Sequence, residues 1–266
     1  MALPALHALS AVAAHLVIAA PPWGADLYRE VRGNVVPLGA FPRGDVAVLF
    51  PPSFRAAWEA RHSPRRIGIA SDFRQWLLTD VVKEHEHRGE TYAALAAAVG
   101  AVAEGPPRWR TDSVPSDAPE GHIGLNPISR SGGVVDWQGY AVLAERIGRP
   151  VVFYGGPGEE ARVARVAGRH LQKVGLSLPE FARSLARCAL FVSNDSGAAH
   201  FSRACGVPTL VIYGSTAPER TGPAGAASVQ GKSPCRPCYR KSCRFDFECL
   251  HIPVDAVARA IGQIVK

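Results

Sequence analysis

The sequence lacks a continuous apolar run long enough to cross a membrane. Its most apolar stretch, from Ala2 to Ala20, is interrupted by Pro4, His7 and His15 and has no basic flank. A membrane-spanning helix needs about 20 consecutive apolar residues, and a signal peptide carries basic residues ahead of its apolar segment. We therefore expect neither a membrane span nor a signal peptide, and a cytoplasmic location.

Internal repeats are also absent, and only 20% of the 266 residues are charged. Apolar residues make up 47% of the chain, which is enough to build the core of one large or two small soluble domains. Lysine and arginine are in excess, giving a formal net charge of +7 and a pI near 9.3. This excess favours an anionic partner such as a phosphorylated metabolite or lipid, an acidic membrane face or nucleic acid, although a basic surface in contact only with water is the alternative.

The six cysteines do not show the usual pair of CxxC motifs separated by a long spacer. Four of them form a C-x2-C-x4-C-x5-C segment at Cys235, Cys238, Cys243 and Cys249. This spacing is compact enough for a tetrahedral zinc site or an iron–sulfur cluster, and plain reduced thiols are the alternative, because disulfides are uncommon in the cytosol. Cys188 and Cys205 lie in apolar contexts and are expected in the core.

Strand and helix patterns alternate along the chain, which predicts an α/β fold. The expected elements of the first half are a helix over Pro4–Ala14, strands over His15–Ala20 and Asp45–Phe50, and helical segments over Arg74–Val82 and Glu90–Gly100. The stretch from Pro106 to Glu120 is rich in Pro, Ser, Asp and Arg and has no apolar period, so we expect an interdomain linker there. The predicted domains span about Met1–Arg110 and Gly121–Lys266.

The second half contains a strand–helix–strand unit. Ala189–Val192 and Thr209–Tyr213 are short apolar strands, and they enclose a polar turn over Ser193–Gly197 and a short helix that ends at Gly206. Such βαβ units build parallel sheets, which bind ligands at the carboxyl ends of their strands. We therefore expect a ligand site in the loops that follow these two strands.

The residue types in these loops indicate an anion site. Asp195 leaves the first strand, and Ser196 and Gly197 open the helix so that unpaired backbone N–H groups face outward. His200 lies one turn along and is able to bond a phosphate or a sugar hydroxyl, and residues 214–216 form a second polar loop. The alternative is that Ser196 only caps the helix and His200 only packs.

An ordered series of motifs here resembles the nucleotide-sugar site of glycosyltransferase family 9, the ADP-heptose:lipopolysaccharide heptosyltransferases. The series is D-[ST]-G-x-x-H, then A-x-G-V-P-T, then G-x-T-x-P-x-R-x-G-P, and it is matched by Asp195, Ser196, Gly197, His200, Gly206–Thr209, Gly214, Thr216, Pro218, Arg220, Gly222 and Pro223, with Ala217 where an Asp is expected. Three motifs of the first half are also similar to this family, at Pro51–Ala56, Pro64–Gly68 and Arg74–Thr79.

The resemblance implies two Rossmann-like α/β domains that face each other across a cleft, the GT-B type. It implies an inverting transfer of a sugar, expected to be heptose from ADP-heptose, to a lipopolysaccharide-core or other envelope glycan, with no cofactor and no metal. The donor-binding residues that we expect are Asp195, Ser196, Gly197, Ala198, Ala199, His200, Thr216, Glu159, Glu160 and Arg130. The expected contacts for an anionic acceptor are Ser53, Arg55, Arg65 and Arg66, because arginine binds phosphate and carboxylate through paired hydrogen bonds, although each of these side chains has a structural role as the alternative.

The sequence departs from the family pattern in two other places. The residues Leu3–Leu6 match a family helix that normally follows a first strand and a Gly-Asp loop, so we expect this chain to lack that strand and the family's catalytic Asp and its first domain to be less stable. A start codon that was assigned too late is the alternative to a protein without its general base. We therefore assign no catalytic residue. Val135 and Asp136 stand before Trp137 where a basic residue is expected, and Arg130 is the candidate substitute. For Glu159 and Glu160, the alternative to binding the donor is an ordinary interaction of acidic side chains with the helix dipole at a helix start.

These departures leave two other functions open. A protein without its general base would bind a nucleotide sugar without turnover, and the basic, Cys-rich tail allows a nucleic-acid binding module. We find no strand with interleaved aromatic and basic residues to support the latter. The expected partners are therefore a nucleotide-sugar donor and an anionic glycolipid or glycan acceptor, with peripheral association at the inner membrane face left open and no nucleic acid.

Overall fold

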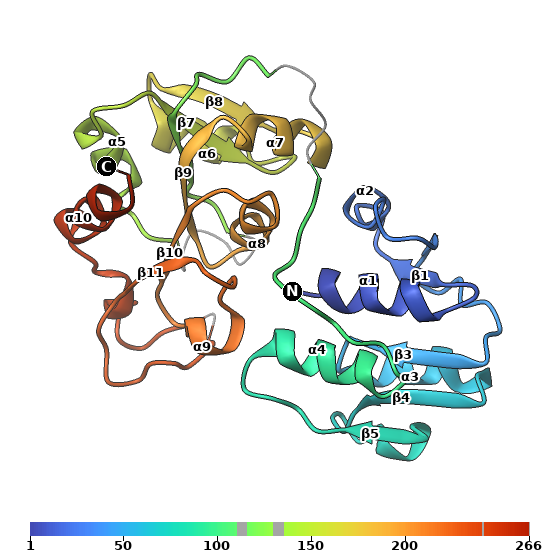
Figure 1. The fold of residues 1–266 in the computed structure, drawn as a ribbon. Helices are drawn as coiled ribbons and strands as arrows, with labels where there is room; N and C mark the ends of the chain where they lie inside the picture. Colours follow the sequence, from blue (N-terminus) through green and yellow to red (C-terminus); the bar gives the residue numbers. More distant parts are fainter. Residues whose placement is uncertain (111–115, 130–135, 241, 266) are drawn as a thin grey trace. The chain divides into compact units, whose positions relative to one another are not determined.

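The computed structural model describes residues 1–110, 116–129, 136–240 and 242–265. The chain divides into two compact units, Met1–Pro107 and Arg108–Lys266 (Figure 1). We refer to them as unit 1 and unit 2 and describe each by itself.

Unit 1 contains two parallel sheets. One pairs β1 (Val17–Ala20) with β2 (Asn34–Pro37), and the other has the order β3 (Val46–Leu49), β4 (Arg65–Ile69) and β5 (Asp80–Val82). The helices are α1 (Leu3–Val12), α2 (Gly24–Leu27), α3 (Phe54–Glu59) and α4 (Arg88–Ala97). Helices α1 and α4 pack together (Figure 1). The side chains of Leu3, Leu6 and Leu9 on α1 are buried.

The segment 74–82 differs from the helix that the sequence predicts. It forms a single 3-10 turn over Gln75–Leu77 and then strand β5, whose Asp80 and Val82 lie opposite Ile67 and Ile69 of β4. A strand of three residues carries too little periodicity to be recognised locally, and only its pairing with β4 stabilises it.

Unit 2 is built on one six-stranded parallel sheet. Its order is β11 (Ala227–Gln230), β10 (Thr209–Tyr213), β9 (Cys188–Asn194), β6 (His122–Asn126), β7 (Val151–Gly155) and β8 (Leu171–Val174). The helices are α5 (Tyr140–Arg146), α6 (Glu160–Ala167), α7 (Leu178–Leu185), α8 (Gly197–Ala204), α9 (Pro218–Thr221) and α10 (Val254–Ile264).

Both faces of the four central strands β6, β7, β9 and β10 are buried, as expected for a parallel sheet covered on both sides, whereas the edge strands β8 and β11 are partly exposed. On one face Leu190 and Val192 of β9 belong to a core cluster shared with α5, α6 and α10. On the other face Phe191 contacts Phe181 of α7, which stacks in turn on Phe201 of α8.

The connections diverge from the centre of the sheet. Strands β6 and β9 are neighbours, but the chain runs from β6 toward β8 on one side and from β9 toward β11 on the other. The carboxyl ends of β6 and β9 therefore flank the topological switch point, where open parallel sheets form a ligand-binding crevice.

Trp109 lies in the stretch that we expected to be a linker. It is only 3% exposed, its backbone N–H donates to the carbonyl of Ala204, and its indole ring packs edge-on against Phe201 of α8. The indole is buried by unit 2, so this part of the stretch belongs to that unit.

In the described parts of the chain, no helix is both long and apolar enough to span a membrane.

Candidate functional site

The turn between β9 and α8 presents an open helix start. Ser196 has extended backbone angles and makes no side-chain capping bond to α8; its Oγ instead lies 2.8 Å from Ser193 Oγ. Among the described side chains none caps the first turn, so the backbone N–H groups of residues 197–199 remain available. Such groups, with the positive end of the helix dipole, bind anions.

Space above this helix start is provided by Gly197. The residue is exposed, and a Cβ atom built on it would meet no atom within 4 Å. Ala199 differs, because its side chain is fully buried in a cluster with Val211 and Tyr213. Ala199 can therefore offer only its backbone N–H to a ligand, whereas Ala198 and His200 are half-buried.

Asp195 lies beside this helix start and is half-buried. Its Oδ2 accepts a hydrogen bond from Thr221 Oγ1 at 3.2 Å, and the hydroxyl of Thr216 is a second partner. Burial raises the pKa of the Asp195 carboxyl, and the hydroxyls of Thr216 and Thr221 oppose that shift. The buried hydroxyl of Tyr213 has no hydrogen-bond partner among the described residues, and its pKa is raised by burial and then by the charge of Asp195.

Asparagines occupy the switch point itself. Asn126 ends β6, and its Oδ1 accepts from Ser193 Oγ at 3.2 Å while its Nδ2 donates to the carbonyl of Tyr154 at 3.0 Å. Asn194 ends β9, and its Nδ2 donates to the carbonyl of Pro127 at 2.9 Å. These bonds tie the ends of β6, β7 and β9 together beneath the open start of α8.

The loop that follows β10 is fixed from one side by a single segment. Arg236 donates to the carbonyls of Gly214 and Thr216, and the N–H groups of Cys238 and Tyr239 both donate to the carbonyl of Ser215 at 3.0 Å. All three carbonyls of residues 214–216 are therefore satisfied by this segment. The loop is held in one conformation, with Thr216 placed against Asp195.

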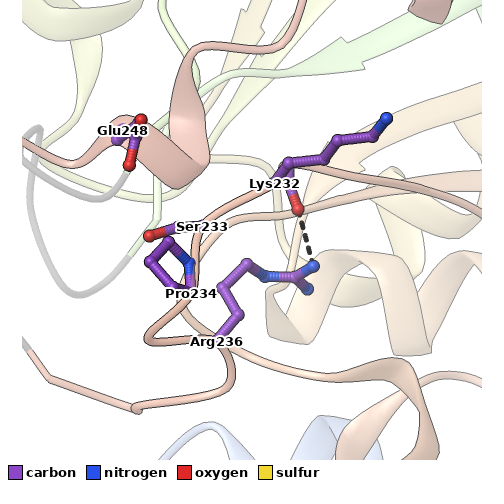
Figure 2. A pocket seen from close by; sticks show the side chains of 6 residues that line it. Lys232, Ser233, Pro234, Arg236 and Glu248 are labelled. Atoms are coloured by element: carbon purple, nitrogen blue, oxygen red, sulfur yellow. Dashed lines mark hydrogen bonds between the residues drawn. The ribbon is translucent and has the colours of Figure 1, made fainter.

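An open cavity of about 610 Å³ lies at the carboxyl end of β11. Figure 2 shows Lys232, Ser233, Pro234, Arg236 and Glu248 around it. Arg236 Nη1 donates to the carbonyl of Gly231 at 2.7 Å, so the guanidinium that fixes the loop after β10 also forms part of this cavity's wall (Figure 2).

Comparison with known sequences decides the family. A sequence model of glycosyltransferase family 9, described as the heptosyltransferase family, matches residues 43–248. The chain belongs to glycosyltransferase family 9. Family 9 is a family of sugar transferases, and the matched range contains the whole turn between β9 and α8 and the loop after β10.

Three similar proteins complete the comparison. A curated relative, lipopolysaccharide heptosyltransferase 1 of Pseudomonas aeruginosa, is 40% identical over 72 residues, which is 26% of this chain and 20% of that protein's length. The structure of E. coli ADP-heptose lipopolysaccharide heptosyltransferase II is 21% identical, with a TM-score of 0.77 over 99% of this chain and 94% of that one. The iron-containing heptosyltransferase TibC of E. coli is 16% identical, with a TM-score of 0.63 over 98% of this chain and 72% of that one.

These structures confirm the predicted α/β fold with parallel sheets, since their likeness extends over nearly the whole chain. The predicted absence of a first strand from unit 1 stays a prediction.

The residues expected to bind a donor in this family 9 member fall into three groups. Asp195, Ser196, Gly197, Ala198, Ala199, His200 and Thr216 come together at the carboxyl ends of β9 and β10. Glu159 and Glu160 lie after β7, where they accept hydrogen bonds from the N–H groups of Gly156 at 2.7 Å and Gly158 at 3.2 Å. Their carboxylates thus shape their own loop. Arg130 lies outside the described residues.

The four residues expected to bind the acceptor are separated in unit 1. Ser53 follows β3 at its carboxyl end and caps α3, while Arg55 is 78% exposed and pairs with Glu59 at 2.6 Å. Arg65 and Arg66 begin β4, at the opposite edge of the sheet. Their guanidinium groups are engaged inside the unit.

Both of these arginines form hydrogen bonds to other residues of unit 1. Arg65 Nη2 bonds Asp80 Oδ1 at 2.8 Å and the carbonyl of Ala98 at 2.9 Å, and Arg66 bonds the carbonyls of Ser63 and Leu77 at 2.6 Å each. These contacts favour the structural alternative for Arg65 and Arg66, because their guanidinium groups already bond a carboxylate and backbone carbonyls of unit 1.

Three site features were not found from the sequence. Asn126 and Asn194 are polar residues that end otherwise apolar strands, and that position was the available signal.

The third feature is Asp136, which is 3% exposed; its Oδ1 accepts from Ser129 N at 2.9 Å, and its Oδ2 pairs with Arg162 at 3.1 Å. Burial raises the pKa of Asp136, with its hydrogen bonds to Ser129 and the charge of Arg162 opposing the shift. The residue that replaces the expected basic contact is therefore part of the loop's internal structure.

The cysteine segment, residues 232–240 and 242–250, contains four free thiols. Cys235, Cys238 and Cys243 are half-buried and Cys249 is buried. Burial raises the pKa of the Cys249 thiol, and the other three thiols add to that shift. Within the described ranges, no three His, Cys, Asp or Glu side chains are arranged to hold a metal ion.

Proposed function

We propose that the chain transfers a glycosyl group from a nucleoside diphosphate sugar to a lipopolysaccharide-core or other cell-envelope glycan, with inversion at the anomeric carbon. The observation that carries this proposal is the uncapped start of α8 beside half-buried Asp195 at the switch point of unit 2. ADP-heptose is the first candidate donor, because one of the similar proteins is the E. coli ADP-heptose lipopolysaccharide heptosyltransferase II.

The chemistry asks little of the protein beyond charge stabilisation and positioning. An acceptor hydroxyl attacks the anomeric carbon, the bond from that carbon to the diphosphate oxygen breaks, and the hydroxyl proton passes to a base. The N–H groups of residues 197–199 face the negative charge that develops on the leaving diphosphate, which lowers the barrier electrostatically. Asp195 and Thr216 offer hydrogen bonds to donor hydroxyls. We assign no residue as the base.

No metal or cofactor takes part in the proposed reaction, because the helix start supplies the charge stabilisation that a metal ion supplies in other transferases. The acceptor is expected to be anionic and glycan-based, with Ser53 and Arg55 at the carboxyl edge of unit 1 as candidate contacts. A lipid-linked acceptor would place the protein at the cytoplasmic face of the membrane.

The test has a binding arm and a turnover arm. The binding arm measures the melting temperature with ADP, UDP, GDP and their sugar conjugates, because a ligand bound only by the folded state raises it. The turnover arm measures nucleoside diphosphate release from ADP-heptose in the presence of acyl-free lipopolysaccharide oligosaccharide. We expect a shift with ADP and ADP-sugars and measurable release.

Each other outcome has a defined meaning. Binding without release would make the chain a nucleotide-sugar binding protein. Absence of any nucleotide shift would exclude a donor site at α8 and contradict the proposed function.

A further inference from the structure

Unit 1 exposes large aromatic side chains on two short helical segments, one after β3 and one after β4. Phe54 is 40%, Trp58 47% and Trp76 65% exposed. The ring of Phe54 stacks against Trp58 at 6.3 Å between centroids and lies 6.1 Å from Trp76, so the three rings form one continuous surface. We call Phe54, Trp58 and Trp76 the aromatic patch. The patch contains two of the chain's five tryptophans. Large contiguous apolar surfaces are uncommon on soluble proteins, and where they occur they mark interaction sites.

The position of the aromatic patch is that of a ligand site. Phe54 and Trp58 belong to α3, which begins a few residues after the carboxyl end of β3, and Trp76 lies on the 3-10 turn after the carboxyl end of β4. These strands are parallel neighbours, so both loops leave the same edge of the sheet. Ligands of open parallel sheets bind at this edge.

A fully buried arginine holds the two loops together. Arg74 Nε donates to the carbonyl of Ile69 at 3.0 Å, and its Nη1 donates to the carbonyls of Pro51 and Ser53 at 2.7 and 3.0 Å. One side chain thus joins the loop after β4 to the loop after β3. The backbone segments that carry the patch are thus joined to each other before any ligand binds, which reduces the entropy lost on binding.

The backbone beside Trp76 is strained. Asp72 and Phe73 have φ angles of 49° and 52°, in the left-handed region that side chains other than glycine avoid, and the ring of Phe73 is 86% exposed. A phenyl ring held in water by a strained backbone does little to stabilise unit 1 itself. Strain of this kind is concentrated at functional sites.

The segments that carry the patch contain charged groups of both signs. The Arg61 guanidinium lies 4.7 Å from the centre of the Trp58 ring, Arg55 pairs with Glu59, and Asp72 lies on the loop of Phe73. Two basic and two acidic groups give no net attraction to an anionic membrane, which clusters of lysine and arginine normally provide. Aromatic rings bordered by both donors and acceptors match a sugar, whose C–H face is apolar and whose edge carries hydroxyls.

We propose that the aromatic patch binds a sugar ring of the acceptor glycan by stacking, with Arg61 and the carboxylates of Glu59 and Asp72 bonding its hydroxyls. The proposal rests on the proposed transferase function for the identity of the ligand as an acceptor, but sugar binding by unit 1 is measurable without turnover and without the nucleotide site.

The experiment follows intrinsic tryptophan fluorescence of the full chain during titration with acyl-free, phosphorylated lipopolysaccharide oligosaccharide, and separately with maltoheptaose and with phosphatidylglycerol vesicles. Trp109 and Trp137 are each 3% exposed and give a constant background. We expect saturable quenching by the oligosaccharide, at least tenfold weaker binding in Trp76→Ala and in Trp58→Ala, and partial recovery in Trp76→Phe. Trp23→Ala is the matched control, because Trp23 is 48% exposed and outside the patch, and its affinity should stay within twofold.

Three results would overturn the proposal: no quenching by either oligosaccharide, an equal loss of affinity in Trp23→Ala, or a blue shift with vesicles only, which would make the patch a membrane contact. Melting curves of each variant exclude misfolding as the cause of a loss. Oligosaccharide binding in a chain that binds no nucleotide would support the patch while contradicting the proposed function, so the two failures are distinguishable.

Discussion

Gly197 opens α8 with no side chain, and the space above it is what allows a phosphate group to approach the backbone. In Gly197→Ala the new methyl group meets no protein atom within 4 Å, so the fold should be retained. The methyl group nevertheless occupies the path to the N–H groups of the first turn. We expect ADP affinity to fall at least fivefold with an unchanged or slightly higher melting temperature, measured by calorimetric titration and thermal unfolding.

Gly262 supplies the control for this prediction. It lies within α10, and a Cβ atom there also meets nothing within 4 Å. Gly262→Ala should stabilise unit 2 by about 0.5–1 kcal/mol, because alanine is the better helix former, and should leave ADP binding unchanged. Equal ADP affinities in the two variants would show that nucleotide does not approach the start of α8.

The burial of His122 leads to a prediction of how the stability of unit 2 depends on pH. It is fully buried, its Nδ1 donates to the carbonyl of Pro119 at 2.7 Å, and its Nε2 accepts from the Tyr154 hydroxyl at 2.8 Å. Burial lowers the pKa of His122 below its usual value near 6.5, with the Pro119 bond opposing the shift. The unfolded chain therefore binds a proton at a higher pH than the folded chain does.

Unit 2 should consequently lose stability as pH falls below about 6.5, by at most about 1.4 kcal/mol per pH unit from this group. Urea unfolding at pH 7.5, 6.5 and 5.5 measures the slope. His122→Gln should reduce the slope, and His62→Gln, at an exposed position, should not. A slope that is the same in all three proteins would contradict a buried neutral imidazole.

At the scale of elements, the cysteine segment determines the conformation of the loop after β10. Arg236 donates to the carbonyls of Gly214, Thr216 and Gly231, and also to Gln230 Oε1 at 3.2 Å. Lysine has one ammonium group and cannot span these acceptors. In Arg236→Lys we expect Thr216 to shift away from Asp195, ADP affinity to fall at least fivefold, and unit 2 to lose about 1–2 kcal/mol of stability.

The control for Arg236 is Arg169, whose side chain is 82% exposed and pairs with Glu145 at 2.8 Å. Arg169→Lys should change stability by less than about 0.5 kcal/mol, since exposed ion pairs contribute little, and should leave ADP affinity unchanged. Nucleotide affinity that is unaffected in Arg236→Lys would show that the loop conformation does not depend on the segment.

At the scale of the whole molecule, the two units differ in how their strands are arranged into sheets. The five strands of unit 1 form two separate sheets, whereas the six strands described in unit 2 form one sheet whose four central strands are buried on both faces. We expect two unfolding transitions, with the less stable one belonging to unit 1. ADP should raise only the second transition, and a fragment of residues 108–266 should retain it. Scanning calorimetry with and without ADP checks this, and a single transition that moves as one with ADP would contradict it.

Much of unit 2 was predictable because its signals are local. The strand Thr209–Tyr213 was predicted with its exact ends, and Asp195, Ser196, Gly197 and Thr216 were identified as a candidate site from strand ends and turn residues. Strand β5 was not, because three residues become a strand only by pairing with β4. The roles of Arg65 and Arg66 were also hidden, since motif similarity does not show at which end of a strand a residue lies or which carbonyls surround it.

The sequence by itself determined the α/β class and the family, and it predicted a ligand site at the carboxyl ends of β9 and β10, because apolar runs, glycines and helix-opening residues act over a few neighbouring positions. Only the tertiary structure decided which groups are already engaged: Arg236 with the loop after β10, Asp136 with Arg162, and Arg74 with the loop between β3 and α3. The partners in each case lie more than 15 residues apart. Contacts over such distances depend on chain packing, which no local pattern contains.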